Sequence, residues 1–268
     1  MDHTSGLREV SRVGMAHEAG YHCPLCQDRG IVTSGEVARL CGCRRERVLF
    51  QLRRRAGLPP AMHEATFERF DLRYYSRGRR DQDSGLTYYE LASRTLAAAR
   101  EFVRGYLRDP HVDGLYLTGP VGSGKTFLAC CVANALLNEG RQVLFLTVPD
   151  WLDRIRSTFD AQNQTTEQEL TDAAREAPVL ILDDLGVHNY TAWTINKLYS
   201  ILNYRLNYLL PTIITTNISL EDLSEYLGDR TTSRLFAACR ACRLLVDVDI
   251  RIRRRQEKEL RARQEAPG

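Results

Sequence analysis

The sequence predicts an α/β fold in which a parallel β-sheet is flanked by helices and preceded by a small metal-binding domain. Three observations support this prediction: alternating strand-like and helix-like segments from residue 86 onward, a glycine-rich octapeptide between the first such strand and helix, and four paired cysteines near the N-terminus. Such alternation is typical of a parallel sheet covered on both faces. A length of 268 residues allows one large or two smaller domains, and an apolar fraction of 43% supports a substantial core.

The cysteines near the N-terminus form two closely spaced pairs. One pair has the spacing C-x₂-C, the other C-x-C, and fourteen residues separate them, including a hairpin-like stretch at 31–37. Two such thiolate pairs can close a tetrahedral Zn²⁺ site, and a segment this short needs metal to fold. Disulfides and free thiols are the alternatives, and His22 and His63 are less favoured substitute ligands. The candidate zinc ligands are Cys23, Cys26, Cys41 and Cys43.

The segment that follows the cysteines is basic. Residues 44–56 read as a helix that ends at Gly57, before two prolines. Its arginines could contact nucleic acid or a partner, or form a solvated helix face. A second basic cluster at 251–263 is diluted by glutamates and is expected to be a solvated face. We therefore expect a zinc-binding domain at 1–57, a linker and start of the main module at 58–85, the main α/β module at 86–256, and a charged tail at 257–268.

The main module alternates strands with helices. A lone C-x₂-C pair at Cys239 and Cys242 lies within a helix-to-strand stretch and is expected to pack in the core. The expected strands lie near 115–118, 142–148, 179–183, 212–216 and 243–247. The expected helices lie near 86–107, 125–139, 150–160, 167–176, 191–208, 220–227 and 230–240.

The octapeptide at residues 119–126 reads Gly-Pro-Val-Gly-Ser-Gly-Lys-Thr and matches the phosphate-binding pattern G-x-x-x-x-G-K-[ST]. Glycines let backbone N–H groups approach phosphates without Cβ clashes, and the following helix adds its N-terminal partial positive charge. Lys125 would contact the β- and γ-phosphates, and Thr126 would offer a hydroxyl to Mg²⁺. The flanking strand and helix argue against an ordinary turn. The candidate phosphate-binding residues are Gly119, Pro120, Val121, Gly122, Ser123, Gly124, Lys125 and Thr126.

Polar residues that follow two later strands complete a candidate nucleotide site. Asp183 and Asp184 follow an apolar run that starts at Val179. The Asp183 carboxylate would hold Mg²⁺, and the Asp184 carboxylate would orient the attacking water. Asn217 ends the next strand and could hydrogen-bond the γ-phosphate or the water. The alternative is a turn residue, because asparagine is common in turns. Arg230 and Arg234 lie four residues apart on one helical face and could reach phosphate charge. Surface helix arginines are the alternative.

The order of these motifs resembles the AAA+ ATPases of the bacterial replicative helicase loader type, DnaC/DnaI-like, and their IstB-type transposition relatives. The resemblance covers about residues 21–251. The matching pieces are the paired cysteines, Ala65-Thr-Phe-Glu-Arg-Phe70, the octapeptide, Leu180-Ile-Leu-Asp-Asp-Leu-Gly186, Thr215-Thr-Asn217, Arg230-x₃-Arg234 and Asp249-Ile-Arg251. The phosphate loop alone is widespread, and its combination with the cysteines is much more specific.

The resemblance implies roles that spacing alone does not. Asn217 matches the sensor-1 position, and Arg234 matches an arginine finger that acts on ATP bound by a neighbouring subunit. Arg230 matches a second basic position beside it, and Arg251 resembles a sensor-2 arginine. The family implies ATP, Mg²⁺, ring or spiral self-association, single-stranded DNA, and a replicative helicase that contacts the N-terminal domain.

One departure from the AAA+ pattern concerns Asp184, where glutamate is usual. Its shorter carboxylate predicts slow hydrolysis that suits a switch better than a motor. Two other functions stay open: an IstB-type transposition helper, and an ATP-gated DNA-binding scaffold with little turnover. Because no stretch has the apolar character of a signal peptide or a membrane span, we expect a cytoplasmic protein without a membrane partner.

Overall fold

The computed structural model describes residues 23–34, 37–158, 166–186, 190–219 and 222–265. Contacts divide the chain between Val48 and Leu49 into a first and a second unit, which are described separately. Among the described residues, none of the helices combines the length and apolar character needed to cross a bilayer.

The first unit holds a two-stranded hairpin and the start of a helix. Strands β1 (Ile31–Ser34) and β2 (Val37–Leu40) pair antiparallel, and α1 (Gly42–Arg55) begins directly after Cys41. The side chains of β2 are exposed throughout, and the buried cluster of this unit consists of Cys23, Cys26 and Cys41. The cysteines therefore occupy the place that an apolar core has in a larger domain.

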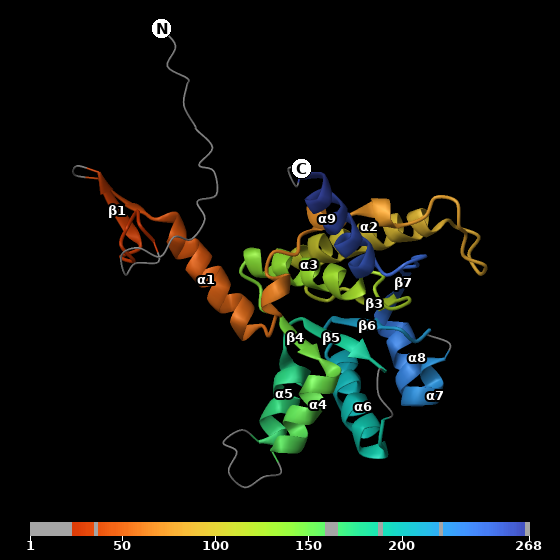
Figure 1. Cartoon of the computed structure of the whole chain (residues 1–268). Coiled ribbons are helices and arrows are strands. Elements are labelled where there is room, and N and C mark those ends of the chain that lie inside the picture. The colour runs from red at the N-terminus through yellow and green to blue at the C-terminus, as the bar shows by residue number, and fades with distance from the viewer. Residues whose placement is uncertain (1–22, 35–36, 159–165, 187–189, 220–221, 266–268) are drawn as a thin grey trace. The chain divides into compact units, whose positions relative to one another are not determined.

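The second unit is built on a five-stranded parallel sheet with the order β4-β5-β6-β3-β7 (Figure 1). The parallel sheet predicted from the sequence is confirmed. Strand β3, which precedes the glycine-rich octapeptide, lies between the central strand β6 and the edge strand β7, so the loop after it follows an inner strand of the sheet. The strands are β3 (Gly114–Thr118), β4 (Leu144–Thr147), β5 (Leu180–Leu185), β6 (Thr212–Thr216) and β7 (Cys239–Arg243).

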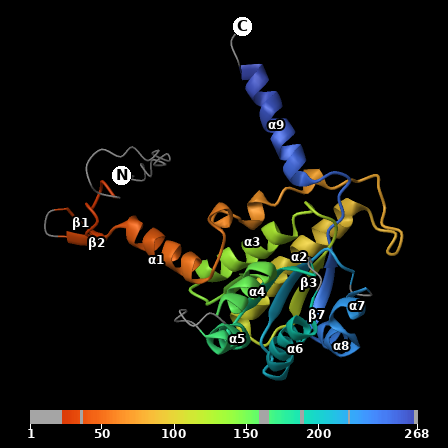
Figure 2. The same ribbon diagram turned by 60° about the horizontal axis from the view of Figure 1, so that its bottom comes forward.

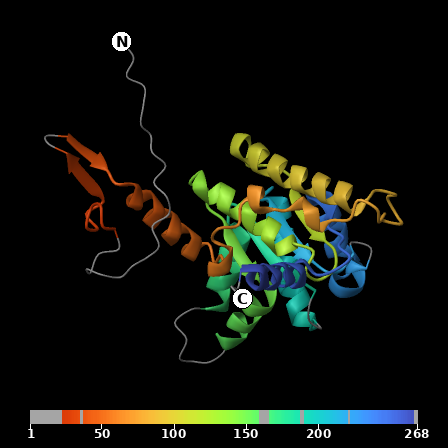
Figure 3. The ribbon, with the colours of Figure 1, turned by 45° about the horizontal axis from the view of Figure 1, so that its top comes forward.

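Helices cover both faces of this sheet (Figures 1 and 2). On one face α2 (Tyr88–Arg108) and α3 (Lys125–Asn138) run side by side (Figure 3). The buried residues on this face include Ile181 and Ile213, whereas Leu180, Leu182 and Ile214 face the other core. The helices of the other face are α4 (Val148–Ser157), α5 (Glu167–Glu176), α6 (Ala192–Asn207), α7 (Leu223–Leu227) and α8 (Asp229–Ala238).

The segment before α2 contains three short 3₁₀ turns that pack against α3 and α2. These are η1 (Pro60–Met62), η2 (Phe67–Arg69) and η3 (Leu72–Tyr74). Phe70 and Tyr75 from this segment are buried in the same core as α3. The segment at 58–85, expected to be a linker and the start of the main module, thus includes residues that pack in the second unit.

A buried arginine fastens α5 and α6 to the sheet. Arg205 is 1% exposed, and burial lowers its pKa to about 9. Its guanidinium donates to Thr212 Oγ1, to the Pro211 carbonyl and to three carbonyls at the C-terminal end of α5. These carbonyls would otherwise lack helical partners, and each buried polar group left unpaired costs about 1–3 kcal/mol.

The largest differences from the expected boundaries lie at the last strand of the sheet. Strand β7 spans Cys239–Arg243 rather than 243–247, and it replaces the end of the helix expected at 230–240. The sequence Cys-Arg-Ala-Cys-Arg is not continuously apolar because β7 is an edge strand with exposed positions. Cys239 and Cys242 pack in opposite core clusters, which confirms that they are packing residues.

The division between the two units lies at another position in the chain than the domain boundary expected after residue 57. Contacts divide the chain nine residues before residue 57, because Leu52 and Ala56 at the end of α1 pack against the second core and the Ala56 carbonyl accepts from Phe145 N–H. Helix α9 (Ile250–Glu265) runs through the division expected after residue 256, and Tyr74 Oη donates to Glu257.

Candidate nucleotide site and metal centre

The glycine-rich loop joins the end of β3 to the start of α3. Gly119 has a φ of +146°, and a Cβ there would lie 1.9 Å from the Leu244 carbonyl oxygen. Gly122 has a φ of +72°, and a Cβ would lie 2.0 Å from Asp249 Cγ. Both positions therefore require glycine, and the loop delivers its backbone to the N-terminus of a 14-residue helix.

Lys125 is buried at the base of this loop. Its ammonium donates to the carbonyls of Gly119 (2.8 Å) and Pro120 (2.9 Å) and to Asn217 Oδ1 (2.8 Å). Burial lowers the pKa of Lys125 to about 8, against the opposing effect of the charges on Asp184 and Asp183. The Lys125 ammonium is thus held by three oxygen acceptors that phosphate oxygens could replace.

The candidate Mg²⁺ ligands meet at the first turn of α3. Thr126 Oγ1 donates to Asp183 Oδ1 at 2.8 Å, and Thr215 Oγ1 donates to the same oxygen at 2.6 Å. Burial raises the pKa of Asp183 to about 6, because the two hydroxyl hydrogen bonds offset it only in part and the Asp184 charge adds to it. A carboxylate and a hydroxyl beside a phosphate loop form a donor set of hard oxygens that fits Mg²⁺.

One cavity of about 490 Å³ brings together most of the residues predicted for the nucleotide site, but Gly119, Pro120 and Ser123 of the loop do not line it. Arg230 and Arg234 are not among the described residues that line it. The Arg234 guanidinium instead lies 6.0 Å from the ring centroid of Tyr199 on α6. Val121 is exposed at 60%, and the Ser123 carbonyl accepts from Tyr75 Oη. The predicted residues that line the cavity are Val121, Gly122, Gly124, Lys125, Thr126, Asp183, Asp184, Asn217 and Arg251.

Another part of the cavity wall could not be predicted from the sequence. It comes from the segment of the 3₁₀ turns, from Phe127 on α3 and from α9, and it is partly aromatic, as suits a flat heterocycle. The sequence signal for this wall is the stretch Ala65–Phe70, which carries the family resemblance but does not itself indicate a contact with nucleotide. The missed wall residues are Met62, Phe70, Asp71, Tyr74, Tyr75, Phe127, Ile250 and Arg254.

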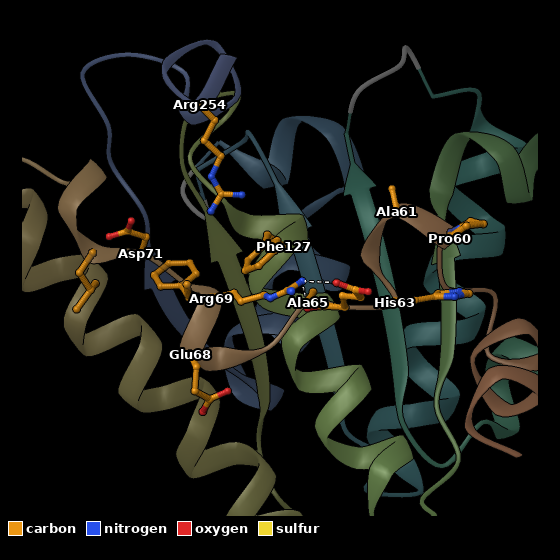
Figure 4. A pocket seen from close by; sticks show the side chains of 12 residues that line it. Pro60, Ala61, His63, Ala65, Glu68, Arg69, Asp71, Phe127 and Arg254 are labelled. Atoms are coloured by element: carbon orange, nitrogen blue, oxygen red, sulfur yellow. Dashed lines mark hydrogen bonds and ion pairs between the residues drawn. The ribbon is translucent and has the colours of Figure 1, made fainter. Parts of the chain in front are cut away.

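A wider hollow of about 780 Å³ adjoins this wall (Figure 4). Arg254 reaches from α9 toward Phe127, and its guanidinium lies 5.5 Å from the ring centroids of Phe127 and Tyr74. Four residues line both hollows and form a wall between them: Phe70, Asp71, Phe127 and Arg254. A nucleotide that fills the inner cavity would contact the start of α9.

The four N-terminal cysteines gather in the first unit. Their Sγ atoms all lie within 4.8 Å of one another, with 3.7 Å between Cys23 and Cys41 and 3.3 Å between Cys26 and Cys43. Four sulfurs bound at about 2.3 Å to one tetrahedral zinc lie about 3.8 Å apart, so the cluster fits zinc. Burial opposes ionisation of Cys26, but hydrogen bonds from Cys43 and from Gly30 N–H lower its pKa to about 7.

A basic side chain lies against this cluster. Arg47 on α1 donates to Cys43 Sγ (3.3 Å) and to Asp28 Oδ1 (2.8 Å). Asp28 Oδ1 also accepts from Cys23 N–H. A guanidinium beside a thiolate offsets the negative charge that four cysteine ligands would bring to the metal.

Comparison with known proteins agrees with this geometry. The family model described as IstB-like ATP binding protein matches residues 41–257. The replicative helicase loader DnaI of Bacillus subtilis is 31% identical over 127 residues, which cover 47% of this chain and 40% of DnaI. The loader DnaC of Escherichia coli K12 is 29% identical over 140 residues, covering 52% of this chain and 56% of DnaC. The chain thus spans about half the length of the curated relatives that it matches.

Solved structures described as DnaC and DnaI also resemble the chain. The crystal structure of the DnaC helicase loader has a TM-score of 0.54 at 26% identity and covers 70% of this chain and 100% of that one. The crystal structure of DnaI has a TM-score of 0.56 at 26% identity, over 70% and 94% of the two chains. Because the family match covers most of the sequence, including the phosphate loop and both aspartates, this chain belongs to the IstB-like ATP-binding proteins, the AAA+ group to which its resemblance to helicase loaders pointed.

Proposed function

We propose that this protein is an ATP-dependent loader that places a replicative helicase on single-stranded DNA. The observation that supports this function most is the likeness to DnaI and DnaC, both described as replicative helicase loaders, in sequence and in fold. The cysteine cluster adds a compact N-terminal unit that could contact the helicase. ATP binding would order a ring or spiral of subunits on the DNA, and hydrolysis would release the helicase.

The cavity supports a hydrolytic site that each chain supplies only in part. Bound Mg²⁺ would neutralise phosphate charge, and Thr126 and Asp183 are the residues that would hold it. Lys125 would leave its loop carbonyls for the phosphates, Asn217 would contact the terminal phosphate or the water, and Asp184 would orient the water. Arg251 lines the same cavity and could sense the nucleotide. Arg234, with Arg230 beside it, would reach ATP bound by a neighbouring subunit.

We expect hydrolysis to be slow in the isolated protein. The charge-stabilising arginine comes from another subunit, so a free monomer lacks it. Asp184 also reaches less far than a glutamate. Turnover at motor-like rates without DNA or a partner would contradict this switch-like function.

The high-pH limit of ATP binding follows from Lys125. The pKa of Lys125 lies near 8, below its ordinary 10.5, so the free protein loses this charge as pH rises above 8. Phosphates require the ammonium, and ATP binding must therefore take up a proton at higher pH. We expect about 0.9 proton taken up at pH 9 and almost none at pH 7.

Calorimetry in buffers of different ionisation enthalpy measures this proton uptake. The affinity for ATP should fall about tenfold per pH unit above 8. Lys125→Arg keeps its charge throughout this range, so any binding that it retains should be free of uptake. An equal ATP affinity at pH 7 and pH 9.5 would contradict the assignment of the low pKa to Lys125.

The transposition helper is the second candidate, because the family model carries the name IstB. Affinity capture of the tagged full chain from its source cell, with and without ATP, separates the two. We expect the replicative helicase to be recovered, and recovery to be lost in Cys41→Ser while ATP binding is kept. Recovery of a transposase in place of the helicase would overturn the loader function. Binding of DNA alone, without turnover, would favour the scaffold.

A further inference from the structure

Strand β5 is irregular where its two aspartates lie. Leu182 pairs with Ile214 of β6, and the next pair is Leu185 with Thr216. Asp183 and Asp184 together therefore face the single residue Thr215. Two residues opposite one define a β-bulge, which bends a strand and is frequent beside active sites.

The packing of the leucines confirms the inserted residue. Leu180 and Leu182 pack in one core cluster and Ile181 in the other, as expected for a strand whose side chains alternate. In a regular strand, Leu185 would lie on the same face as Ile181. It packs with Leu180 and Leu182 instead, so the strand has shifted its alternation by one residue between Leu182 and Leu185.

This shift is what lets both carboxylates serve one site. Neighbouring side chains of a regular strand point to opposite faces, yet Asp183 and Asp184 line the same cavity. Asp184 has a φ of +56°, in the left-handed region that few residues other than glycine adopt. Aspartate and asparagine tolerate this region better than other side chains do.

Thr215 is the partner that supports this conformation. The residue is fully buried, and its hydroxyl makes two hydrogen bonds inside the bulge. It donates to Asp183 Oδ1 at 2.6 Å and accepts from the Asp184 N–H at 3.0 Å. The Asp184 N–H, which the bulge removes from the hydrogen bonds of the sheet, therefore has a partner. The Thr215 hydroxyl oxygen links this N–H to the Asp183 carboxylate.

We propose that Thr215 is a positioning residue that holds the bulge of β5 and thereby aims the Asp184 carboxylate at the reacting end of the nucleotide. The positive φ explains why this protein has aspartate where glutamate is usual, because the backbone must turn there before the side chain can reach the cavity. This inference rests on the proposed hydrolysis of ATP and concerns how the chain performs it.

The first test compares Thr215→Val, which keeps the shape but loses the hydroxyl, with Thr215→Ser, which keeps the hydroxyl. For Thr215→Val we expect kcat to fall about 10–100-fold, as for other partners that orient a site residue, with ATP affinity within about threefold. Thr215→Ser should restore kcat to within about threefold of the natural protein. A double variant with Asp184→Asn should be no slower than Asp184→Asn alone, because both changes disable the same carboxylate.

A matched control separates positioning from simple loss of a buried hydrogen bond. Thr95 on α2 is also buried, and its hydroxyl donates to the Arg243 carbonyl at 3.0 Å. Thr95→Val should lower thermal stability by an amount similar to Thr215→Val but leave kcat unchanged. If Thr215→Val hydrolyses ATP as fast as the natural protein, the inference is wrong. If the natural protein shows no hydrolysis even with DNA and helicase, the proposed function fails instead.

The second test changes Asp184 and remains informative where Thr215→Val does not fold. Asp184→Asn should fold normally, because asparagine tolerates positive φ, and should lose turnover. Asp184→Glu should unfold at a lower temperature than Asp184→Asn and hydrolyse ATP no faster than the natural protein. A glutamate variant of full stability and at least tenfold higher kcat would overturn the explanation of the aspartate.

Discussion

Removal of zinc is expected to unfold the first unit and to leave the ATP-binding unit folded. The described part of the first unit has cysteines as its buried cluster, while Val37 and Leu40 of its hairpin are exposed. Without an apolar core, the free energy that folds the segment must come from metal binding, which is worth about 10–16 kcal/mol in small zinc domains. The second unit has two large apolar cores of its own and does not depend on this site.

Native mass spectrometry and hydrogen exchange measure these effects on the full chain. One zinc ion should be bound, and chelation should abolish amide protection in residues 23–48 while α3 and the sheet keep theirs. Cys41→Ser should behave like the chelated protein. His63→Ala is the matched control, because His63 contacts the Leu58 carbonyl and the Phe50 ring and lies outside the cysteine cluster. Reduced, freshly purified protein that holds no metal would rule out the site.

The main sheet could be predicted because two independent sequence signals, an apolar run and the turn or helix residues beside it, indicate most of its strands. Runs such as Val179–Leu182 are short and apolar, and turn or helix signals flank them, so length and periodicity agree. Strand β7 lacks such an apolar run, since it lies at the edge of the sheet and has the exposed residues Arg240 and Ala241. The run at 244–246 that follows is more apolar, and the strand was therefore expected there. In the structure, Leu244 lies beside Gly119, beyond the end of the strand.

The site divides in the same way. Lys125 and Thr126 could be proposed from the sequence because one motif fixes their spacing within a strand, loop and helix, and Asp183 because it ends a short apolar strand. The role of Thr215 could not, because it depends on the register between β5 and β6, which are separated by a whole helix in the sequence. The aromatic wall was missed for a related reason: Phe70 and Tyr75 lie some fifty residues before the phosphate loop and reach it only through the packing of the 3₁₀ turns on α3.

The bulge at Asp184 bears on the slow turnover proposed above. Sequence alone attributes the slow rate to a short carboxylate, whereas the structure adds a backbone turn that moves that carboxylate toward the cavity. A shorter side chain on a turned backbone can therefore hold the water that a longer side chain holds from a regular strand. We therefore propose that the absence of a neighbouring arginine limits the rate in the isolated chain more than the length of the Asp184 side chain does.

Arg234→Ala is expected to abolish ATP hydrolysis in the assembled protein without weakening ATP binding. Arg234 lies on α8, outside the residues that line its own chain's cavity, and its guanidinium is held near the Tyr199 ring. We therefore propose that this side chain acts on a nucleotide that another subunit presents. Arginine fingers of this kind raise kcat by about 10³–10⁵-fold, so the loss should be at least about 10³-fold.

Mixing two inactive variants tests the role of Arg234 between subunits. Lys125→Ala loses ATP binding but keeps Arg234, and Arg234→Ala binds ATP but lacks the guanidinium. Each should be inactive alone, and a mixture should recover part of the activity, because some neighbouring pairs then combine an intact ATP site with an intact Arg234. The matched control is Arg240→Ala, which removes an exposed arginine paired with Glu101 and should hydrolyse ATP normally. Full activity of Arg234→Ala, or no recovery in mixtures that assemble normally, would show that this arginine does not complete a neighbour's site.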